Sequence, residues 1–209
     1  MRRFFGYMPG NLFVIVAPSG AGKTSLVNEL LQREPNIRLS ISFTTRQPRE
    51  GELHGREYHF VTRAAFEKMI AGGDFLEHAN VFGNYYGTSR RWIEEQLAGE
   101  HDVLLEIDWQ GAQQVRKLFP HMVGIFIMPP SLEELRRRLE RRGKDAPETI
   151  ERRLSGARED ISHVLEFEYI IVNESFDSAA TDLHAVVRAT HVSRAQQAVR
   201  LEKLVNEFR

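Results

Sequence analysis

A glycine-rich turn at residues 17–24 constrains this chain more than any other feature. It reads Ala-Pro-Ser-Gly-Ala-Gly-Lys-Thr, and it lies directly after an apolar run and directly before a helical pattern. Successive backbone N–H groups in such a turn point to one side and bind phosphate oxygens, and the new helix adds its positive end. We expect Gly20 and Gly22 to adopt positive φ, Lys23 to contact the β- and γ-phosphates, and Thr24 to coordinate Mg²⁺.

The first position of this turn departs from the strict pattern, because Ala17 stands where glycine is usual. We expect Ala17 to be tolerated as the end of a strand with ordinary extended geometry. With average composition, a match of this kind arises by chance in about one or two of every hundred chains of this length. Because a strand is expected before the turn and a helix after it, a turn that binds no ligand is the weaker interpretation.

The order of apolar runs predicts an α/β fold. The runs are nearly continuous, as in strands buried on both faces, and helical patterns at residues 24–31 and 131–139 lie between them. Such alternation favours a parallel sheet of five strands with helices on both sides, the core of a P-loop NTPase. The expected strands lie at residues 12–17, 37–43, 103–107, 123–128 and 169–172.

The rest of the chain divides around this core. Residues 44–90 are rich in Gly, Tyr, Phe and Thr and predict a small β-rich insertion. Residues 136–158 are a charged, helical stretch within a core that spans residues 11–43 and 91–190. Residues 191–209 predict a C-terminal helix, which would pack on the core or form a subunit contact.

Composition excludes several classes of function. The formal net charge of the 209 residues is −1, so bulk charge does not argue for nucleic acid or an acidic membrane surface. Without cysteine the chain has no disulfide, thiol nucleophile or thiolate metal site. The eight histidines show no zinc spacing, and no run of about 18 apolar residues could span a membrane. We expect a soluble, cytoplasmic protein, because the apolar run after Arg3 is too short for a signal peptide.

Three groups of polar residues could complete a phosphate site. The run at residues 103–108 ends in Glu106 and Asp108, which could hold a metal at a strand end or could simply be solvated. Arg46 and Arg49 lie on a stiff turn, with Tyr58 nine residues after Arg49. Two guanidinium forks and a phenol hydroxyl suit a phosphate monoester, although surface arginines are often solvated and tyrosines often pack in sheets.

The arginines of the charged stretch at residues 136–158 allow two interpretations. Arg138 and Arg142 are four residues apart, so they share one face of a helix and could reach a common anion. Glu133 and Glu134 precede Arg137 and Arg138 by four residues, which equally fits a solvated helix held by ion pairs.

Taken together, six motifs resemble those of bacterial guanylate kinases, a family of P-loop nucleoside monophosphate kinases. The resemblance extends from about residue 11 to about residue 188, and it implies transfer of the γ-phosphoryl group of ATP to GMP, with Mg²⁺ as cofactor. In addition to Ala17, the chain departs from the family's pattern at two positions, with Thr88 in place of Ser and Glu106 in place of Asp. Both replacements keep the hydroxyl or carboxylate oxygen of the usual residue. The motifs lie at residues 17–24, 44–49, 83–87, 107–111, 138–143 and 171–173.

The resemblance also implies roles for individual residues, and it makes residues 44–90 a GMP-binding subdomain and residues 136–158 a lid. ATP binding is implied for Ala17, Pro18, Ser19, Gly20, Ala21, Gly22, Lys23, Thr24 and Asn173. GMP binding is implied for Ser42, Arg46, Arg49, Tyr58, Glu77, Tyr86, Thr88 and Asp108. Catalytic contributions are implied for Lys23, Arg46, Arg138, Arg142 and Arg153. Thr24 and Glu106 would hold Mg²⁺ directly or through water.

Hydrogen-bonding chemistry independently favours guanine as the acceptor base. Guanine presents two donors, N1–H and N2–H₂, and a buried Glu77 carboxylate accepts both, while Ser42 or Thr88 serves the remaining edge. Adenine would leave that carboxylate unpaired. No general base is expected, because a phosphate monoester with a second pKa of ~6 is already a nucleophile at neutral pH.

Two alternatives remain open from the sequence alone. The first is a kinase for another nucleotide or a sugar phosphate on the same scaffold. The second is a catalytically inactive guanylate-kinase-like module that binds proteins. The intact glycine turn with Lys23 and Thr24 argues against the second, because a scaffold has no use for Mg²⁺. Nothing in the sequence indicates nucleic acid or membrane as a partner, and the number of subunits stays open.

Overall fold

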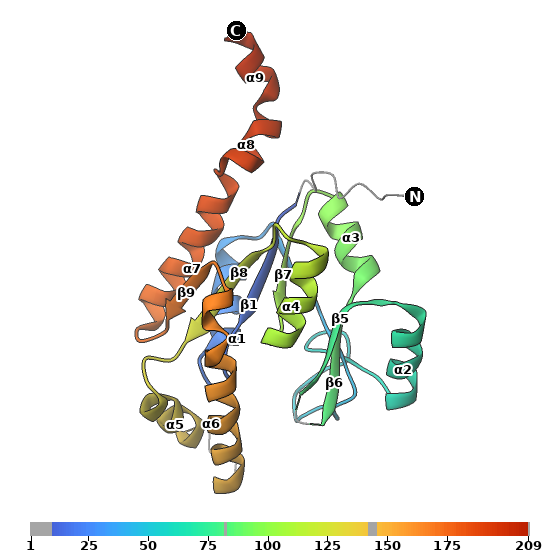
Figure 1. The fold of residues 1–209 in the computed structure, drawn as a ribbon, viewed down its shortest axis with the longest axis vertical. Helices are drawn as coiled ribbons and strands as arrows, with labels where there is room; N and C mark the ends of the chain where they lie inside the picture. Colours follow the sequence, from blue (N-terminus) through green and yellow to red (C-terminus); the bar gives the residue numbers. More distant parts are fainter. Residues whose placement is uncertain (1–9, 82, 142–145, 209) are drawn as a thin grey trace.

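The computed structural model describes residues 10–81, 83–141 and 146–208. Its main sheet has five parallel strands in the order β2-β7-β1-β8-β9 (Figure 1). This confirms the predicted five-stranded parallel sheet flanked by helices. The strands are β1 (Leu12–Val16), β2 (Ile37–Leu39), β7 (Asp102–Glu106), β8 (Val123–Met128) and β9 (Tyr169–Val172).

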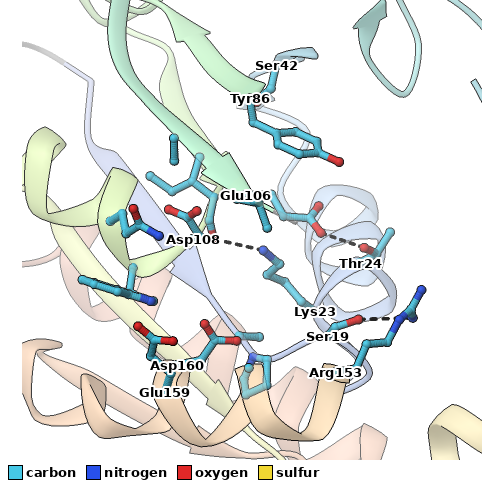
Figure 2. A pocket seen from close by; sticks show the side chains of 18 of the residues that line it. Ser19, Lys23, Thr24, Ser42, Tyr86, Glu106, Asp108, Arg153, Glu159 and Asp160 are labelled. Carbon is cyan, nitrogen blue, oxygen red and sulfur yellow. Dashed lines mark hydrogen bonds between the residues drawn. The ribbon is translucent and has the colours of Figure 1, made fainter. Parts of the chain in front are cut away.

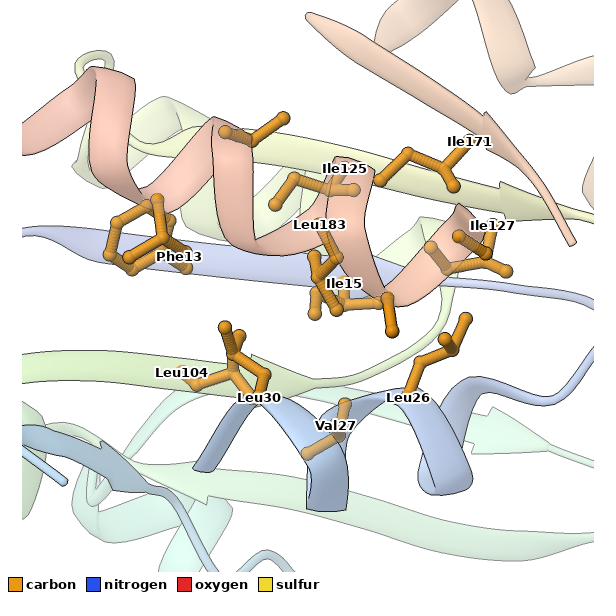
Figure 3. Packing of buried hydrophobic residues seen from close by; sticks show 14 of the residues in the cluster. Phe13, Ile15, Leu26, Val27, Leu30, Leu104, Ile125, Ile127, Ile171 and Leu183 are labelled. Atoms are coloured by element: carbon orange, nitrogen blue, oxygen red, sulfur yellow. The ribbon is translucent and has the colours of Figure 1, made fainter. Parts of the chain in front are cut away.

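Helices cover both faces of this sheet, which explains why its strands are apolar without alternation. On one face Phe13 and Ile15 pack with α1 (Lys23–Arg33) and α7 (Phe176–His191), as Figure 3 shows. On the other face Val14 and Val16 belong to the cluster that includes residues of α3 (Arg90–Ala98) and α4 (Trp109–Leu118). Successive side chains of a strand point to opposite faces, so β1 must be apolar throughout.

A second, smaller sheet is formed within residues 43–89. Its order is β4-β3-β6-β5, and β5 and β6 pair antiparallel. Helix α2 (Arg63–Gly72) covers it through Phe66, whose ring centroid lies 4.5 Å from that of Phe75. The predicted strand at residues 37–43 ends earlier in the structure, because the chain leaves the main sheet after Leu39 and Phe43 pairs in the second sheet. The strands are β3 (Phe43–Thr44), β4 (His59–Phe60), β5 (Phe75–Val81) and β6 (Asn84–Ser89).

The charged stretch predicted as a lid contains two helices. These are α5 (Leu132–Arg141) and α6 (Pro147–Ser162), followed by the short 3₁₀ helix η1 (Val164–Glu166). The two helices share a small apolar cluster of their own, separate from the two clusters of the main sheet. Its members are Leu135, Leu139, Ile150, Leu154 and Ala157. Arg136 of α5 also forms an ion pair with Glu151 of α6.

The C-terminal segment forms two short helices, α8 (Arg194–Arg200) and α9 (Glu202–Glu207), where the sequence predicted one. The backbone departs from helical geometry at Leu201, which has φ −104° and ψ 9°. The two helices extend away from the sheet (Figure 1). No helix within the described residues is long and apolar enough to cross a membrane.

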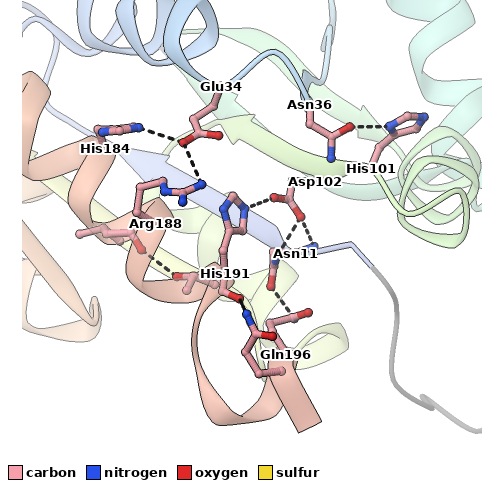
Figure 4. A network of polar contacts seen from close by, with 12 residues as sticks. Asn11, Glu34, Asn36, His101, Asp102, His184, Arg188, His191 and Gln196 are labelled. Carbon is pink, nitrogen blue, oxygen red and sulfur yellow. Dashed lines mark hydrogen bonds and ion pairs between the residues drawn. The ribbon is translucent and has the colours of Figure 1, made fainter. Parts of the chain in front are cut away.

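A buried polar network holds the start of this segment to the main sheet (Figure 4). The Asp102 side chain is 4% exposed and accepts hydrogen bonds from the backbone N and the Nδ2 of Asn11, at 2.7 and 2.8 Å. His191 Nε2 lies 2.5 Å from the other Asp102 oxygen, and Gln196 donates to Asn11 Oδ1. These contacts supply the partners that a buried carboxylate requires. They lie at the N-terminal ends of β1 and β7.

Candidate functional site

A pocket of about 480 Å³ lies beyond the carboxyl ends of β1 and β7, where ligands bind in open parallel sheets (Figure 2). Four parts of the chain line it. They are the glycine turn, the second sheet with the residues beside it, the segment 106–110 between β7 and α4, and one side of α6. The predicted site residues that line the pocket are Ala17, Pro18, Ser19, Gly20, Gly22, Lys23, Thr24, Ser42, Tyr58, Glu77, Tyr86, Glu106, Asp108 and Arg153.

The glycine turn has the backbone geometry that the sequence predicts. Gly20 and Gly22 have φ of 99° and 97°, in the region that favours glycine. A Cβ atom on Gly22 would also lie 2.3 Å from Asn173 Nδ2, so this position has no room for a side chain. Ala17 follows β1 directly, and Glu100 is the single non-glycine residue with positive φ in the described ranges. Ala17 therefore does not have a positive φ, although the strand predicted at residues 12–17 ends one residue earlier, at Val16.

Lys23 and Thr24 lie at the first turn of α1 and face the end of β7. Lys23 Nζ donates a hydrogen bond of 3.1 Å to the carbonyl of Ile107. The Thr24 hydroxyl donates one of 2.6 Å to Glu106 Oε1. Two hard oxygen donors at this position fit Mg²⁺, which usually takes one or two protein oxygens and completes its shell with water and phosphate. The described residues contain no group of three or more His, Asp or Glu side chains that could hold a metal ion.

Glu77 is the most deeply buried acid of the pocket. It lies on β5, is 3% exposed, and accepts a 2.6 Å hydrogen bond from the hydroxyl of Thr88 on β6. Burial raises the pKa of Glu77 to about 7, although the Thr88 hydrogen bond lowers it. A Cβ atom on Gly111 would lie 2.6 Å from Glu77 Oε2, so the missing side chain at Gly111 leaves space for this carboxylate.

Asp108 begins α4 and also faces the pocket. Its Oδ1 accepts a 2.7 Å hydrogen bond from the backbone N–H of Gly111, which caps the helix. Its Oδ2 is buried and has no hydrogen-bond partner in the part of the chain that the structure describes. Burial raises the pKa of Asp108, while the hydrogen bond from Gly111 and the charge of Lys23 lower it. An unpartnered buried acceptor in a pocket is suited to a donor from a ligand.

The two predicted tyrosines lie together in the pocket, whereas the two predicted arginines do not line it. The rings of Tyr58 and Tyr86 are 5.8 Å apart, and burial raises the pKa of Tyr58 to about 12. The Arg46 guanidinium lies 5.4 Å from the centre of the Tyr58 ring and pairs with Glu52 at 2.9 Å. Arg49 is exposed. Arg46 therefore lies beside a tyrosine of the pocket wall, and neither arginine lines the pocket itself.

The arginines of the predicted lid also differ in position. Arg153 of α6 lines the pocket and lies 3.4 Å from the Ser19 hydroxyl. Arg138 of α5 donates to the carbonyl of Asn173 at 2.8 Å and pairs with Glu134, away from the pocket lining. Arg142 lies outside the described residues, so its predicted role stays a prediction.

Asn173, predicted near adenine, supports the glycine turn from behind. Its side chain is 6% exposed, and its Nδ2 donates a 2.7 Å hydrogen bond to the carbonyl of Ala21. Ala21 is itself fully buried, so neither residue lines the pocket. The structure therefore gives Asn173 a direct contact with the glycine turn, and its contact with adenine stays a prediction.

Two acidic residues of α6 that were not identified from the sequence also line the pocket. They are Glu159 and Asp160, one turn or more beyond Arg153 on the same helix. A signal for them exists in the spacing, because Arg153, Gly156 and Asp160 follow i, i+3, i+7 and share one helix face. The aromatic neighbour Trp109 was also missed.

Comparison with known proteins agrees with this geometry. The guanylate kinase family model matches residues 9–190. The guanylate kinase of Dechloromonas aromatica is 57% identical over 202 residues, covering 95% of this chain and all of the relative. That of Thiobacillus denitrificans is 56% identical over 201 residues, with 96% of each chain covered. A crystal structure of guanylate kinase from Anaplasma phagocytophilum superposes with a TM-score of 0.76 at 38% identity, covering 90% of this chain and 89% of that one.

Proposed function

The chain belongs to the guanylate kinase family and is an ATP:GMP phosphotransferase, and we propose that the pocket between the glycine turn and the second sheet is its active site. One observation carries this proposal. Lys23 and Thr24 of the glycine turn and Glu77 of the second sheet line a single cavity. Two nucleotides that exchange a phosphoryl group directly must lie in one continuous space, with the reacting atoms close together.

ATP would bind at the glycine turn. The backbone N–H groups of residues 19–24 and the positive end of α1 would surround its phosphates. Lys23 would exchange the carbonyl of Ile107 for a β- or γ-phosphate oxygen. Arg153, already beside Ser19, would add a second positive charge from the other wall. Both are charge-assisted contacts to oxygens that gain negative charge during the transfer.

Thr24 and Glu106 would hold Mg²⁺, directly or through water. Support comes from their oxygens, which lie 2.6 Å apart beside the proposed phosphate site. When bound, Mg²⁺ neutralises charge on the phosphates of ATP. These two residues would position the metal at the end of β7.

GMP would bind on the side of the second sheet. The Glu77 carboxylate would accept hydrogen bonds from guanine N1–H and N2–H₂, with Ser42 at the remaining edge. Thr88, which is fully buried, would contribute through the hydrogen bond that it donates to Glu77. Asp108 Oδ2, which lacks a partner among the described residues, would accept a further donor. Tyr58 and Tyr86 would contact the GMP phosphate. For Arg46 to join them it has to release Glu52, and Arg49 has to turn inward.

A panel of nucleoside monophosphates tests this function. With Mg²⁺ and ATP, a coupled assay for ADP is expected to show turnover with GMP and far less with AMP, CMP, UMP and dTMP. Equal turnover of AMP and GMP would contradict the role of Glu77 in selecting the base. ATP and GMP binding without any turnover would favour the protein-binding alternative. A cytoplasmic location is part of the same proposal, because both substrates are small soluble nucleotides.

Substitution of Gly111 by alanine tests the space reserved for Glu77. The added methyl group would lie 2.6 Å from Glu77 Oε2 and 3.3 Å from Ile107 Cδ1, so the carboxylate has to move. We expect the KM for GMP to rise at least about tenfold, as for a displaced hydrogen-bonding group, while the KM for ATP stays within about twofold. The control is Ala112→Gly, which changes the neighbouring residue of the same helix. Gly51→Ala is not suitable as a control, because Gly51 has a positive φ. An unchanged KM for GMP would contradict the argument.

A further inference from the structure

Strand β5, which carries Glu77, lies at the edge of the second sheet. Within the described residues it pairs with β6 alone, and its register with β6 shifts between Phe75 and Glu77. On the open side of an edge strand, the backbone N–H and C=O groups of alternate residues need partners from elsewhere. An irregular register also bends a strand locally. The direction in which Glu77 points therefore depends on what holds the open side of β5.

The side chain of Gln114 on α4 holds that side of β5 at the residue next to Glu77. Its Oε1 accepts a 3.2 Å hydrogen bond from the backbone N–H of His78, and its Nε2 donates one of 2.9 Å to the carbonyl of His78. The Nε2 also donates to the carbonyl of Gln110, at 3.3 Å, within the same helix. The Gln114 amide thus exchanges both hydrogen bonds with one residue, as the backbone of a neighbouring strand does.

The face of α4 that carries Gln114 also makes room for the Glu77 carboxylate. Gly111 lies three residues before Gln114, so the two positions are neighbours on the helix surface. A Cβ atom on Gly111 would lie 2.6 Å from Glu77 Oε2. Asp108, the other acid proposed to accept a donor of the base, caps the N-terminus of the same helix. Helix α4 therefore carries one of these acids and holds the strand that carries the other.

Apolar packing also joins β5 to α4, but it does not fix the strand in the same way. Leu76 belongs to the apolar cluster that contains Ala112 and Val115 of α4. Apolar contacts are not directional, so they keep the two elements close without fixing how the strand slides or turns. Hydrogen bonds depend on distance and angle. The pair of hydrogen bonds from Gln114 is thus the contact that sets the position of β5 along α4.

We propose that Gln114 is a positioning residue for recognition of the guanine base. It holds His78, and with it the neighbouring Glu77 carboxylate, at a fixed place relative to Asp108. Gln114 does not line the pocket, so its effect on the substrate passes through Glu77. This inference rests on the proposed binding of GMP at Glu77.

The preference for GMP over IMP measures this positioning. IMP lacks the 2-amino group of GMP, so the ratio of the two kcat/KM values reports the hydrogen bond between that group and Glu77. We expect wild type to prefer GMP by on the order of 100-fold, as for a buried hydrogen bond to a charged group. In Gln114→Ala the carboxylate is no longer held in place, and we expect the ratio to fall to about tenfold, with the KM for ATP within about twofold of wild type.

Two further variants separate hydrogen bonding from packing and from general damage. Gln114→Met keeps the length and the helix propensity of glutamine but cannot pair with His78, so it is expected to match Gln114→Ala. Gln113→Ala makes the same change at the next position, where the side chain donates to Glu166 and not to β5, and it should keep the wild-type ratio. The ratio does not depend on the fraction of enzyme that is folded, so a variant that is only destabilised leaves it unchanged.

The outcomes distinguish this inference from the function on which it rests. Wild type that used IMP as well as GMP, or neither of them, would contradict the assignment of Glu77 to guanine and the inference with it. A strong preference for GMP that both Gln114 variants retained would leave the assignment of Glu77 intact and overturn the role of Gln114.

Hydrogen exchange in wild type tests the contact without any substitution. The backbone amide of His78 is expected to exchange at least about 100-fold more slowly than in an unstructured peptide, although it lies on the open side of β5. Exchange at the unstructured rate would mean that Gln114 does not hold the strand in solution. That result would overturn the inference even if the variants folded poorly.

Discussion

The Glu77→Gln substitution is expected to lower kcat/KM for GMP by about 10⁴-fold while the KM for ATP changes little. Glu77 is buried on β5, so its carboxylate has no water to replace a lost partner. Glutamine presents one acceptor and one NH₂ group, and that NH₂ group would face a guanine donor. Sites that recognise a ligand through buried hydrogen bonds lose about 10⁴-fold when those bonds cannot form.

Steady-state kinetics with each substrate varied in turn measures this prediction. Glu95→Gln, on an exposed position of α3, removes the same charge outside the pocket and should leave both KM values unchanged. A Glu77→Gln enzyme that lost as much with ATP as with GMP would show a general defect, and the assignment of Glu77 to guanine would be wrong.

The same substitution is expected to stabilise the empty enzyme at high pH. The folded-state pKa of Glu77, about 7, is raised above its ordinary value of 4.5, so folding favours the protonated acid. This contribution to stability is complete below pH 4.5 and is lost as the pH rises through 7. At pH 8 the glutamine variant should therefore unfold several degrees higher than wild type, by a difference on the order of 2–3 kcal/mol, and at pH 4 the two should nearly coincide. Equal differences at both pH values would contradict the pKa argument.

Features that depend on neighbouring residues could be predicted from the sequence. The glycine turn is one, because eight consecutive residues carry its conformation, its charge and its place between a strand and a helix. The parallel sheet is another, because burial on both faces leaves a continuous apolar run in each strand. The order of the five strands within the sheet could not be derived from these local patterns.

Features that depend on tertiary packing could not be predicted in the same way. Asn173 contacts Ala21 across 152 positions of the chain, and no local pattern marks that contact. Arg46 pairs with Glu52 because the turn between them folds back, so its side chain lies along the pocket wall and not in the cavity. Asp160 reaches the pocket because Ile161 and His163 fix the orientation of α6. Its sequence neighbours show only a charged amphipathic helix.

The Lys23→Met substitution is expected to lower kcat by about 10²- to 10³-fold, the usual loss when one preorganised donor to a developing charge is removed. Methionine keeps the length and much of the apolar stem of lysine but has no charge. The fold should persist, because the structure gives Lys23 Nζ one hydrogen bond, to the carbonyl of Ile107, with a net value of about 1 kcal/mol. The five carboxylates of the pocket would then face ATP with Arg153 as the remaining cation of its lining.

Single-turnover and steady-state rates with saturating ATP and GMP separate the chemical step from binding in this variant. The loss should appear in kcat, with a smaller change in the KM for GMP, because Glu77 and the tyrosines lie on the other side of the pocket. Lys68→Met removes an equal charge from the exposed side of α2 and should behave as wild type. If Lys23→Met kept a kcat within threefold of wild type while folding normally, the transferred phosphoryl group could not lie at the glycine turn, and the direction of transfer across the pocket would have to be reassigned.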